Sequence, residues 1–284
     1  MKKQFFVYLF ASLFMGLAVT SCSDDDDAPV NVLAGKTFDL QPVFVQEAED
    51  AFSDPVIVGR PDIIEWESTN LIYTAGEGQS GSSVVDVMNL LLAFMPIEGI
   101  DKDAKETYMH ALQRTLRHIS FLPDGNIQAE YVENLTTEKD NWQKSPLGVA
   151  TYRIESNSTM RLFINLDKIM MSRAGAEEAL APLMATLLKV LEGGIPLNYV
   201  VDGAKMSVYM DQNFLLPILR DLKPLFGNQA ILDFVKEEAN KAMPGLGFVI
   251  NPIIGAIFRD MPAVIDGTTS IKLGLNLVEA NSLV

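Results

Sequence analysis

A glycine-rich segment, Gly76–Gly81, is the first stretch whose spacing matches a known chemistry. Glycines at positions 76, 78 and 81 reproduce the G-x-G-x-x-G pattern that binds the pyrophosphate of a dinucleotide. That use needs a parallel strand after the following helix, which the chain does not offer, and Glu77 would bring negative charge to the phosphate. We interpret the segment as a turn before a helix and expect no nucleotide cofactor.

The two histidines, His110 and His118, are the next candidates for chemistry. Glu106, His110 and Arg114 recur every four residues along a predicted helix, which is typical of a solvated charged face. A metal bound by Glu106 and His110 would need further ligands, but the neighbouring residues of this helix face are positively charged arginines, which cannot bind a metal ion. We therefore expect neither a metal site nor acid–base catalysis by histidine.

Paired carboxylates are the working groups of glycoside hydrolases. Glu65 and Glu67 share one face of a predicted strand, and Glu237 and Glu238 are adjacent on a predicted helix. We interpret both pairs as solvated surface, and carboxylate-dependent glycan hydrolysis is kept as an alternative. Serine hydrolysis is not expected, because Ser80, in the sequence Gly78-Gln79-Ser80-Gly81, lacks the G-x-S-x-G spacing of a nucleophile elbow.

Trp66 and Trp142 are the candidate ligand contacts, since an exposed aromatic ring stacks on the apolar face of a sugar. Burial in the core is the alternative for both, because aromatic residues on strands often pack inside. Tyr73, Tyr131 and Tyr152 could stack on a sugar in the same way if they are exposed.

Cys22 is the only cysteine of the chain, and the residues before it suggest covalent modification. Residues 1–21 begin with Lys2 and Lys3, continue with an apolar run from Phe5 to Val19 and end in small residues, as a secretory signal peptide does. If Cys22 is acylated after cleavage, no thiol remains for a disulfide, a thiolate metal site or a nucleophile.

Val19–Cys22 resembles a bacterial lipobox, in which an aliphatic residue and two small residues precede the cysteine that receives a diacylglycerol. The resemblance implies that Cys22 is the lipidation site and that the protein is held on a membrane, at about 0.8 kcal/mol per buried methylene. The following residues resemble the export tag of Bacteroidetes-type lipoproteins: Ser23, Asp24, Asp25, Asp26 and Asp27.

The export tag implies an outer-membrane protein that faces the cell exterior. A periplasmic position is the alternative, with the aspartates serving only as a solvated tether whose like charges repel one another. The predicted organisation is a signal peptide over 1–21, an acidic flexible tether over 22–32 and one domain over 33–284.

Composition excludes one class of partner and bounds the membrane contact. The chain has a formal net charge of −15, which repels nucleic acid, and a hydrophobic share of 48%, which is ample for a core. No segment after the leader reaches about 18 uninterrupted apolar residues, so the acyl group on Cys22 is the only predicted membrane attachment. The sequence leaves the oligomeric state open.

Alternating apolar runs separated by turn residues predict strands over 33–40, 43–45, 56–58, 63–66, 71–73, 119–122, 127–132, 150–154, 160–164, 197–201, 205–210 and 270–277. Helical periodicity predicts helices over 84–95, 102–118, 176–191, 212–225 and 229–242, and a short apolar helix after the Gly- and Pro-rich stretch 244–252. Because strands and helices do not alternate singly, we predict an α+β fold. It is an antiparallel sheet or open barrel with several inserted helices packed against it.

The predicted helix 84–95 is the most apolar, and Ser83 and Asp86 have the spacing of a capping box at its start. We expect this helix to be buried on nearly all sides. Methionines add adaptable apolar surface to the helices. This surface indicates either a large core or a cavity for an apolar ligand.

Two further segments, Phe121–Ile127 and Ser145–Gly148, resemble parts of a lipocalin-like member of the Bacteroidetes lipoproteins of unknown function. Together with the tag, they indicate a surface lipoprotein without catalytic activity that binds a ligand or assists a nutrient-capture complex. A carrier of an apolar ligand, such as a lipid, and a glycan hydrolase are the alternatives. No catalytic residue, cofactor or metal ligand follows from the resemblance.

Overall fold

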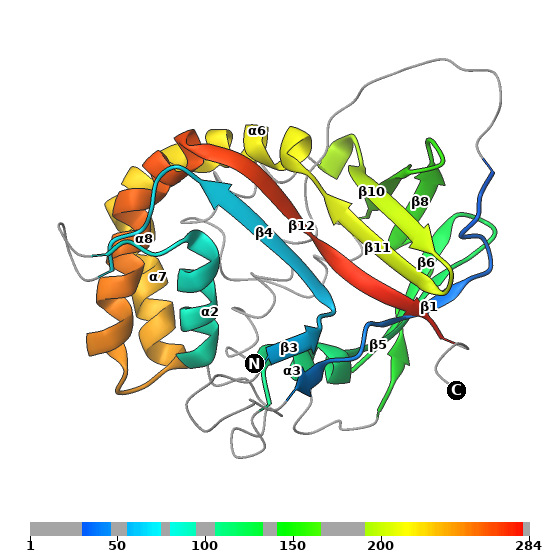
Figure 1. Cartoon of the computed structure of the whole chain (residues 1–284), viewed down its shortest axis with the longest axis horizontal. Helices are drawn as coiled ribbons and strands as arrows, with labels where there is room; N and C mark the ends of the chain where they lie inside the picture. Colours follow the sequence, from blue (N-terminus) through cyan, green and yellow to red (C-terminus); the bar gives the residue numbers. More distant parts are fainter. Residues whose placement is uncertain are drawn as a thin grey trace.

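The computed structural model of the chain describes residues 30–46, 56–74, 80–94, 106–132, 141–165 and 191–280. An antiparallel β-barrel forms one side of the molecule and a group of helices the other (Figure 1). The predicted leader, Cys22 and the acidic tag lie outside the described residues, as do residues 176–190 of a predicted helix.

The barrel consists of eight strands in the order β1-β5-β6-β8-β9-β10-β11-β12, and β12 pairs back to β1. The strands are β1 (Thr37–Leu40), β5 (Leu116–Phe121), β6 (Asn126–Tyr131), β8 (Ala150–Ile154), β9 (Thr159–Ile164), β10 (Ile195–Asp202), β11 (Lys205–Met210) and β12 (Thr268–Glu279). The predicted α+β class with a barrel is confirmed. The prediction that the barrel is open was wrong, because Phe38 pairs with Glu279 and Leu40 with Leu277.

Shorter strands extend this framework. β4 (Asp62–Ser68) lies outside the barrel and pairs with β12 from Thr268 to Leu275. β1 pairs with the same edge of β12 further along the strand, from Leu277 to Glu279. β7 (Gln143–Lys144) pairs with β6, and β2 (Phe44–Gln46) pairs with β3 (Val56–Gly59) in a separate sheet. The predicted strand 71–73 is reduced to a single bridge between Ile72 and Ser82.

Side chains fill the interior of the barrel. On β1, Phe38 and Leu40 are buried and Thr37 and Asp39 are not, as the alternation of the sequence predicts. Their buried partners come from the surrounding strands and from the segment before β1: Leu33, Phe121, Tyr152, Met160, Tyr199, Met206 and Leu277. In general shape the barrel is lipocalin-like, with an interior that holds packed side chains.

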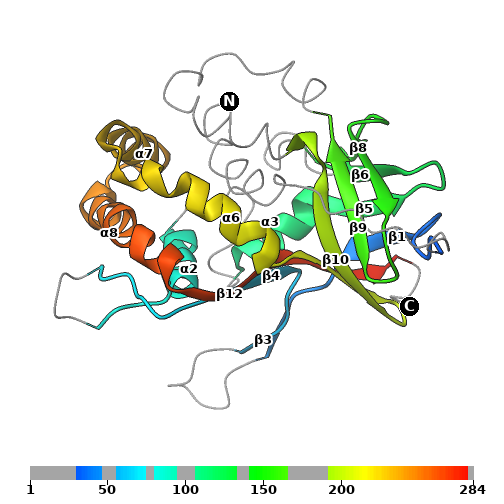
Figure 2. The same cartoon turned by 90° about the horizontal axis from the view of Figure 1, so that it is seen from above.

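The two ends of the barrel differ. Turns between strands and the segment 31–36 close one end, which we call the tether end; there the amide of Gly35 donates to Phe121 O at 2.7 Å. The opposite end, which we call the helix end, lies where β11 leads into α6 (Gln212–Leu222) and β12 begins. Figures 1 and 2 show the chain segment before β1 and the helices on opposite sides of the barrel.

Helices cover the helix end and the outlying part of β4 and β12. Besides α6, they are α2 (Val84–Phe94), α3 (Tyr108–Thr115), the 3₁₀ helix η1 (Lys223–Gly227), α7 (Gln229–Ala242) and α8 (Gly247–Asp266). α6 buries Phe214, Leu215 and Ile218 against β12 and its neighbours. α2 and α8 pack together with Trp66 of β4, while α7 packs on α8.

Tertiary contacts account for two of the differences from the predicted helix boundaries. The predicted helix 102–118 ends at Thr115, because Leu116 pairs with Tyr131 as the first residue of β5. The stretch 244–252 was expected to interrupt the helices, but α8 already begins at Gly247 and includes Pro252 and Pro262. Burial of its isoleucine-rich face outweighs the backbone hydrogen bonds that the prolines remove.

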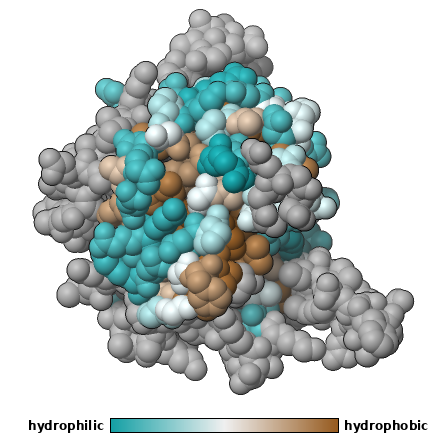
Figure 3. Space-filling model, turned by 90° about the vertical axis from the view of Figure 1, so that its left-hand side faces the viewer, coloured by the Kyte–Doolittle hydropathy of each residue, from teal (hydrophilic) through white to brown (hydrophobic). Residues whose placement is uncertain are grey.

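The capping box of α2 is confirmed, since the amide of Asp86 donates to Ser83 Oγ at 3.1 Å and the amide of Ser83 to Asp86 Oδ2 at 3.3 Å. The expectation of burial on nearly all sides was wrong, because Leu90 is 40% exposed. Figure 3 shows this helical side of the molecule, with apolar side chains gathered between hydrophilic ones.

Among the described residues, α8 alone has the length and apolar composition to cross a membrane. The sequence expectation, that no uninterrupted run of about 18 apolar residues follows the leader, is not contradicted, because Asn251, Arg259 and Asp260 interrupt α8. α8 also has the character of a core helix, because Ile250, Ile254, Val264 and Ile265 are buried against neighbouring elements. We interpret α8 as part of the domain core.

Candidate functional site

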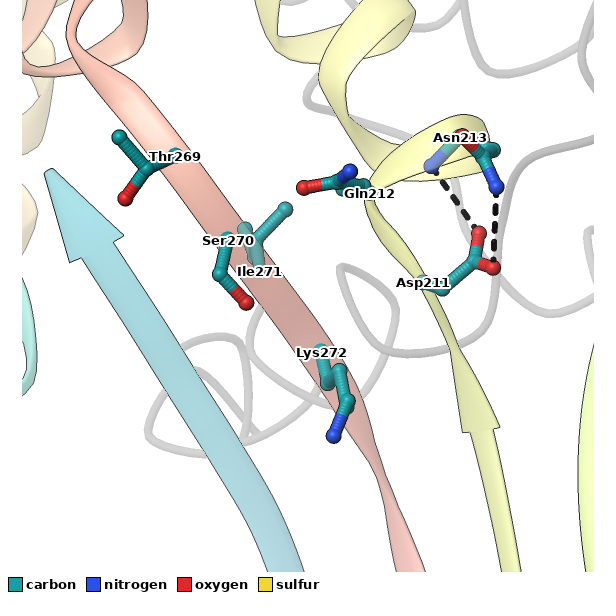
Figure 4. A pocket seen from close by; sticks show the side chains of 7 residues that line it. All are labelled: Asp211, Gln212, Asn213, Thr269, Ser270, Ile271 and Lys272. Atoms are coloured by element: carbon teal, nitrogen blue, oxygen red, sulfur yellow. Dashed lines mark hydrogen bonds between the residues drawn. The ribbon is translucent and has the colours of Figure 1, made fainter.

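A polar hollow of about 350 Å³ lies at the helix end, between the first turn of α6 and the beginning of β12. Figure 4 shows the side chains that border it. Its lining residues are Asp211, Gln212, Asn213, Thr269, Ser270, Ile271 and Lys272. Six of these seven side chains carry a hydrogen-bonding group, so the hollow is suited to a polar ligand.

The α6 side of the hollow is ordered by a helix cap. Asp211 directly follows β11, and its carboxylate accepts hydrogen bonds from the backbone amide of Asn213 at 3.0 Å and from the side-chain amide of Asn213 at 3.3 Å. This is the bond by which an aspartate begins a helix. The cap fixes Asp211 and Asn213, and Gln212 follows as the first residue of α6, with its side chain directed toward β12 (Figure 4).

The β12 side of the hollow is shaped by an irregularity in the strand. The register between β12 and β4 shifts between Thr268 and Ser270, so that Thr269 has no cross-strand partner. Such bulges redirect side chains at the edge of a site. The hydroxyl of Thr269 donates weakly to Glu67 O at 3.4 Å.

Lys272 gives the hollow a positive charge. Its ammonium lies 3.1 Å from Glu65 Oε2 and 5.6 Å from the centre of the Tyr209 ring. The hydrogen bond to Glu65 raises the pKa of Lys272 above its ordinary value. The ammonium is therefore retained at neutral pH beside an aromatic ring.

Of the predicted aromatic contacts, Trp66 packs between the core beneath α6 and the core beneath α8, and its indole N–H donates to Thr268 Oγ1 at 2.9 Å. Trp142 lies far along the chain from the hollow, with the guanidinium of Arg117 5.6 Å from its ring centre. Neither tryptophan lines the hollow.

The carboxylate pairs lie at the surface, as their interpretation required. Glu65 pairs with Lys272, and Glu67 stands opposite Ser270. Glu237 and Glu238 both pair with Lys241, at 2.5 and 2.8 Å. None of the four lines the hollow.

The histidines have separate structural partners. His110 Nδ1 accepts from the amide of Thr107 at 2.9 Å and so helps to cap α3. His118 lies on β5, where its Nδ1 contacts Asp39 and its Nε2 is 3.9 Å from Glu130. Within the described ranges, no group of three or more His, Cys, Asp or Glu side chains is arranged so that it could hold a metal ion.

The glycine-rich segment falls mostly outside the described residues. Gly81 is described, and a Cβ there would lie 2.6 Å from Leu71 Cβ, so the glycine permits close packing before α2. Every strand pairing in the described part of the chain is antiparallel. The parallel strand that dinucleotide binding requires is therefore not seen after α2.

Fold and hollow together define a closed antiparallel barrel with a polar depression at its helix end. No protein-family model matches the chain, and no curated protein or solved structure matches it either. The hollow residues were not singled out from the sequence. The one signal for them was the aspartate at 211 before an apolar helical pattern, which is the pattern of an N-cap.

Proposed function

We propose that this chain is a lipid-anchored outer-membrane protein, exposed at the cell exterior, that binds a polyhydroxylated ligand of the glycan class. The observation that carries the ligand class is the polar hollow between α6 and β12. The anchor and the location rest on the lipobox and the acidic tag, Cys22–Asp27.

The chemistry of the lining supports a sugar over an apolar molecule. A sugar hydroxyl both donates and accepts, and the hollow offers a carboxylate, two amides, two hydroxyls and an ammonium. An apolar carrier is less favoured, because side chains pack the barrel interior.

Binding without turnover is the proposed role. The carboxylates weighed for hydrolysis, Glu65, Glu67, Glu237 and Glu238, lie outside the hollow lining. Asp211 is the single carboxylate in the lining, whereas the usual glycosidase mechanisms use two.

Replacement of Gln212 by alanine tests the hollow. We expect Gln212→Ala to weaken binding of a neutral oligosaccharide about fivefold, since a lost hydrogen bond costs about 1 kcal/mol. Titration calorimetry against a panel of neutral oligosaccharides is the measurement. Gln229→Ala is the matched control. Gln229 is also an exposed glutamine at the first position of a helix, but that helix is α7, away from the hollow lining. Equal affinities for both variants would place the ligand elsewhere.

Replacement of Cys22 by alanine tests the anchor. We expect Cys22→Ala to move the protein from the membrane fraction to the soluble fraction, because the acyl chains supply the predicted attachment. Ser23→Ala, the adjacent control, should leave it in the membrane fraction. Retention of Cys22→Ala on the membrane would show that Cys22 is not the anchor. For the predicted location, protease added to intact cells should cleave the wild-type chain.

A further inference from the structure

Exposed apolar side chains gather at the tether end of the barrel. Eight large hydrophobic residues are exposed in the described part of the chain, and four of them belong to this end. They are Val30 (72% exposed), Val32 (45%), Val200 (54%) and Val201 (37%). Single exposed apolar residues are common on any protein, whereas several at one end indicate a contact surface.

Hydrogen bonds and turns bring these residues to the same end. Val32 lies in the segment 31–36, which the side chain of Asn31 ties to Tyr152 Oη at 3.1 Å. Val200 and Val201 precede the turn between β10 and β11, whose Ala204 O accepts from Glu279 N at 2.7 Å.

The length of the tether decides what covers this surface. Seven residues lie between Cys22 and Val30, which makes eight residue-to-residue steps, and an extended chain spans at most about 3.6 Å per step, or roughly 29 Å in all. The tether end is therefore held close to the acyl chains. Leu71, Leu90 and Phe248 are exposed as well. Leu90 lies on α2 and Phe248 (79% exposed) on α8, and Figures 1 and 2 show these helices on the opposite side of the barrel from the segment before β1.

Charge at the tether end is mixed. Lys36 pairs with Glu279 at 3.3 Å, the exposed Lys205 stands opposite the exposed Asp202, and Asp124 is exposed in the turn between β5 and β6. A surface without a dominant sign suits a zwitterionic headgroup layer, which neither attracts nor repels it strongly.

We propose that the tether end rests on the lipid headgroup layer of the membrane that holds the acyl chains, with Val200 and Val201 in contact with lipid. This inference rests on the proposed lipidation of Cys22. It orients the molecule, because the helices and the polar hollow then face away from the membrane, where a ligand arrives from outside.

Site-specific fluorescence in phosphatidylcholine vesicles tests this orientation. Because Cys22 is the only native cysteine and is acylated, a cysteine introduced by Val200→Cys carries an environment-sensitive dye alone. Phe248→Cys at the helix end is the matched control, since both positions are exposed. We expect spin-labelled lipid to quench the dye at position 200 at least about twofold more than the dye at position 248.

Two failures are distinguishable in this experiment. If mass spectrometry finds acyl chains and the protein floats with the vesicles, but the dye at position 200 is quenched no more than the dye at 248, the orientation is wrong and the anchor stands. If the chain carries no acyl group and does not float, the proposed anchor is wrong and the orientation falls with it.

Discussion

Replacement of Gly274 by alanine is expected to lower the free energy of unfolding by about 3 kcal/mol or more, because the barrel leaves no room for a methyl group at this position. Gly274 lies on β12 opposite Tyr209 of β11. A Cβ at this position would lie 2.1 Å from Val208 O and 2.6 Å from Tyr209 Cα. Both contacts are with backbone, so relief requires β11 and β12 to separate. Urea unfolding measures the loss.

The same substitution at Gly255 is the control and has the opposite expected sign. Gly255 lies within α8, and the nearest atom to an added Cβ is Lys236 Nζ at 3.9 Å. Alanine in a helix interior is favoured over glycine by about 1 kcal/mol, so Gly255→Ala should stabilise the chain. Equal small effects of Gly274→Ala and Gly255→Ala would contradict the tight β11–β12 pairing.

Replacement of Asp62 by asparagine has the second large expected effect. Asp62 is 6% exposed, and it accepts hydrogen bonds from Arg60 Nε at 3.1 Å, from Arg60 Nη2 at 3.0 Å and from the hydroxyl of Tyr108. Removal of the charge weakens the hydrogen bonds to this buried acceptor and should cost about 2 kcal/mol, because water can partly solvate the guanidinium of Arg60, which is 39% exposed. Glu65→Gln, on the same strand but in an exposed ion pair, should cost less than about 1 kcal/mol. Chemical unfolding of the two variants compares these costs.

The same cluster predicts alkaline sensitivity. Burial, and then the charge of Asp62, raise the pKa of Tyr108 above its ordinary value of 10.0. The folded chain therefore keeps the phenolic proton where the unfolded chain loses it. The contribution of this proton to the free energy of unfolding is complete below pH 10 and declines above it, by up to about 1.4 kcal/mol per pH unit.

Tyr108→Phe should remove that part of the decline. Burial also raises the pKa of Tyr199, so part of the slope should remain in the variant. Unfolding of both chains between pH 9 and pH 11 gives the comparison. Parallel slopes for wild type and Tyr108→Phe would show that Tyr108 does not hold its proton more tightly when folded.

Local patterns predicted most of the elements. The alternation of apolar and polar residues predicted β1, β8, β9 and the β10–β11 hairpin, because residues on a half-buried strand alternate between core and solvent. Closure of the barrel was not predictable in this way. It depends on the pairing of Phe38 with Glu279, residues at opposite ends of the domain, which no local pattern encodes.

The boundary errors have the same origin. Residues 116–118 continue a helical pattern, but pairing with β6 makes them a strand. Pro252 and Pro262 suggest a break, but packing of the apolar face keeps α8 continuous. In both places tertiary contacts outweigh local propensity.

The candidate site was less predictable than the fold. Asp211 and Lys272 are far apart in sequence, and neither belongs to a motif. They approach each other because β11 and β12 pair and because α6 begins directly after β11. The aromatic residues Trp66 and Trp142, chosen from their chemistry, do not line the hollow, although Trp66 pairs with the lining residue Ile271.

Hydrogen exchange with and without a bound oligosaccharide tests most directly whether the hollow is the binding site. Binding there should slow exchange of the backbone amides of residues 211–213 and 269–272 and leave those of β5 and β6, on another part of the barrel, unchanged. Protection confined to another surface, or no protection at saturating oligosaccharide, would contradict the account.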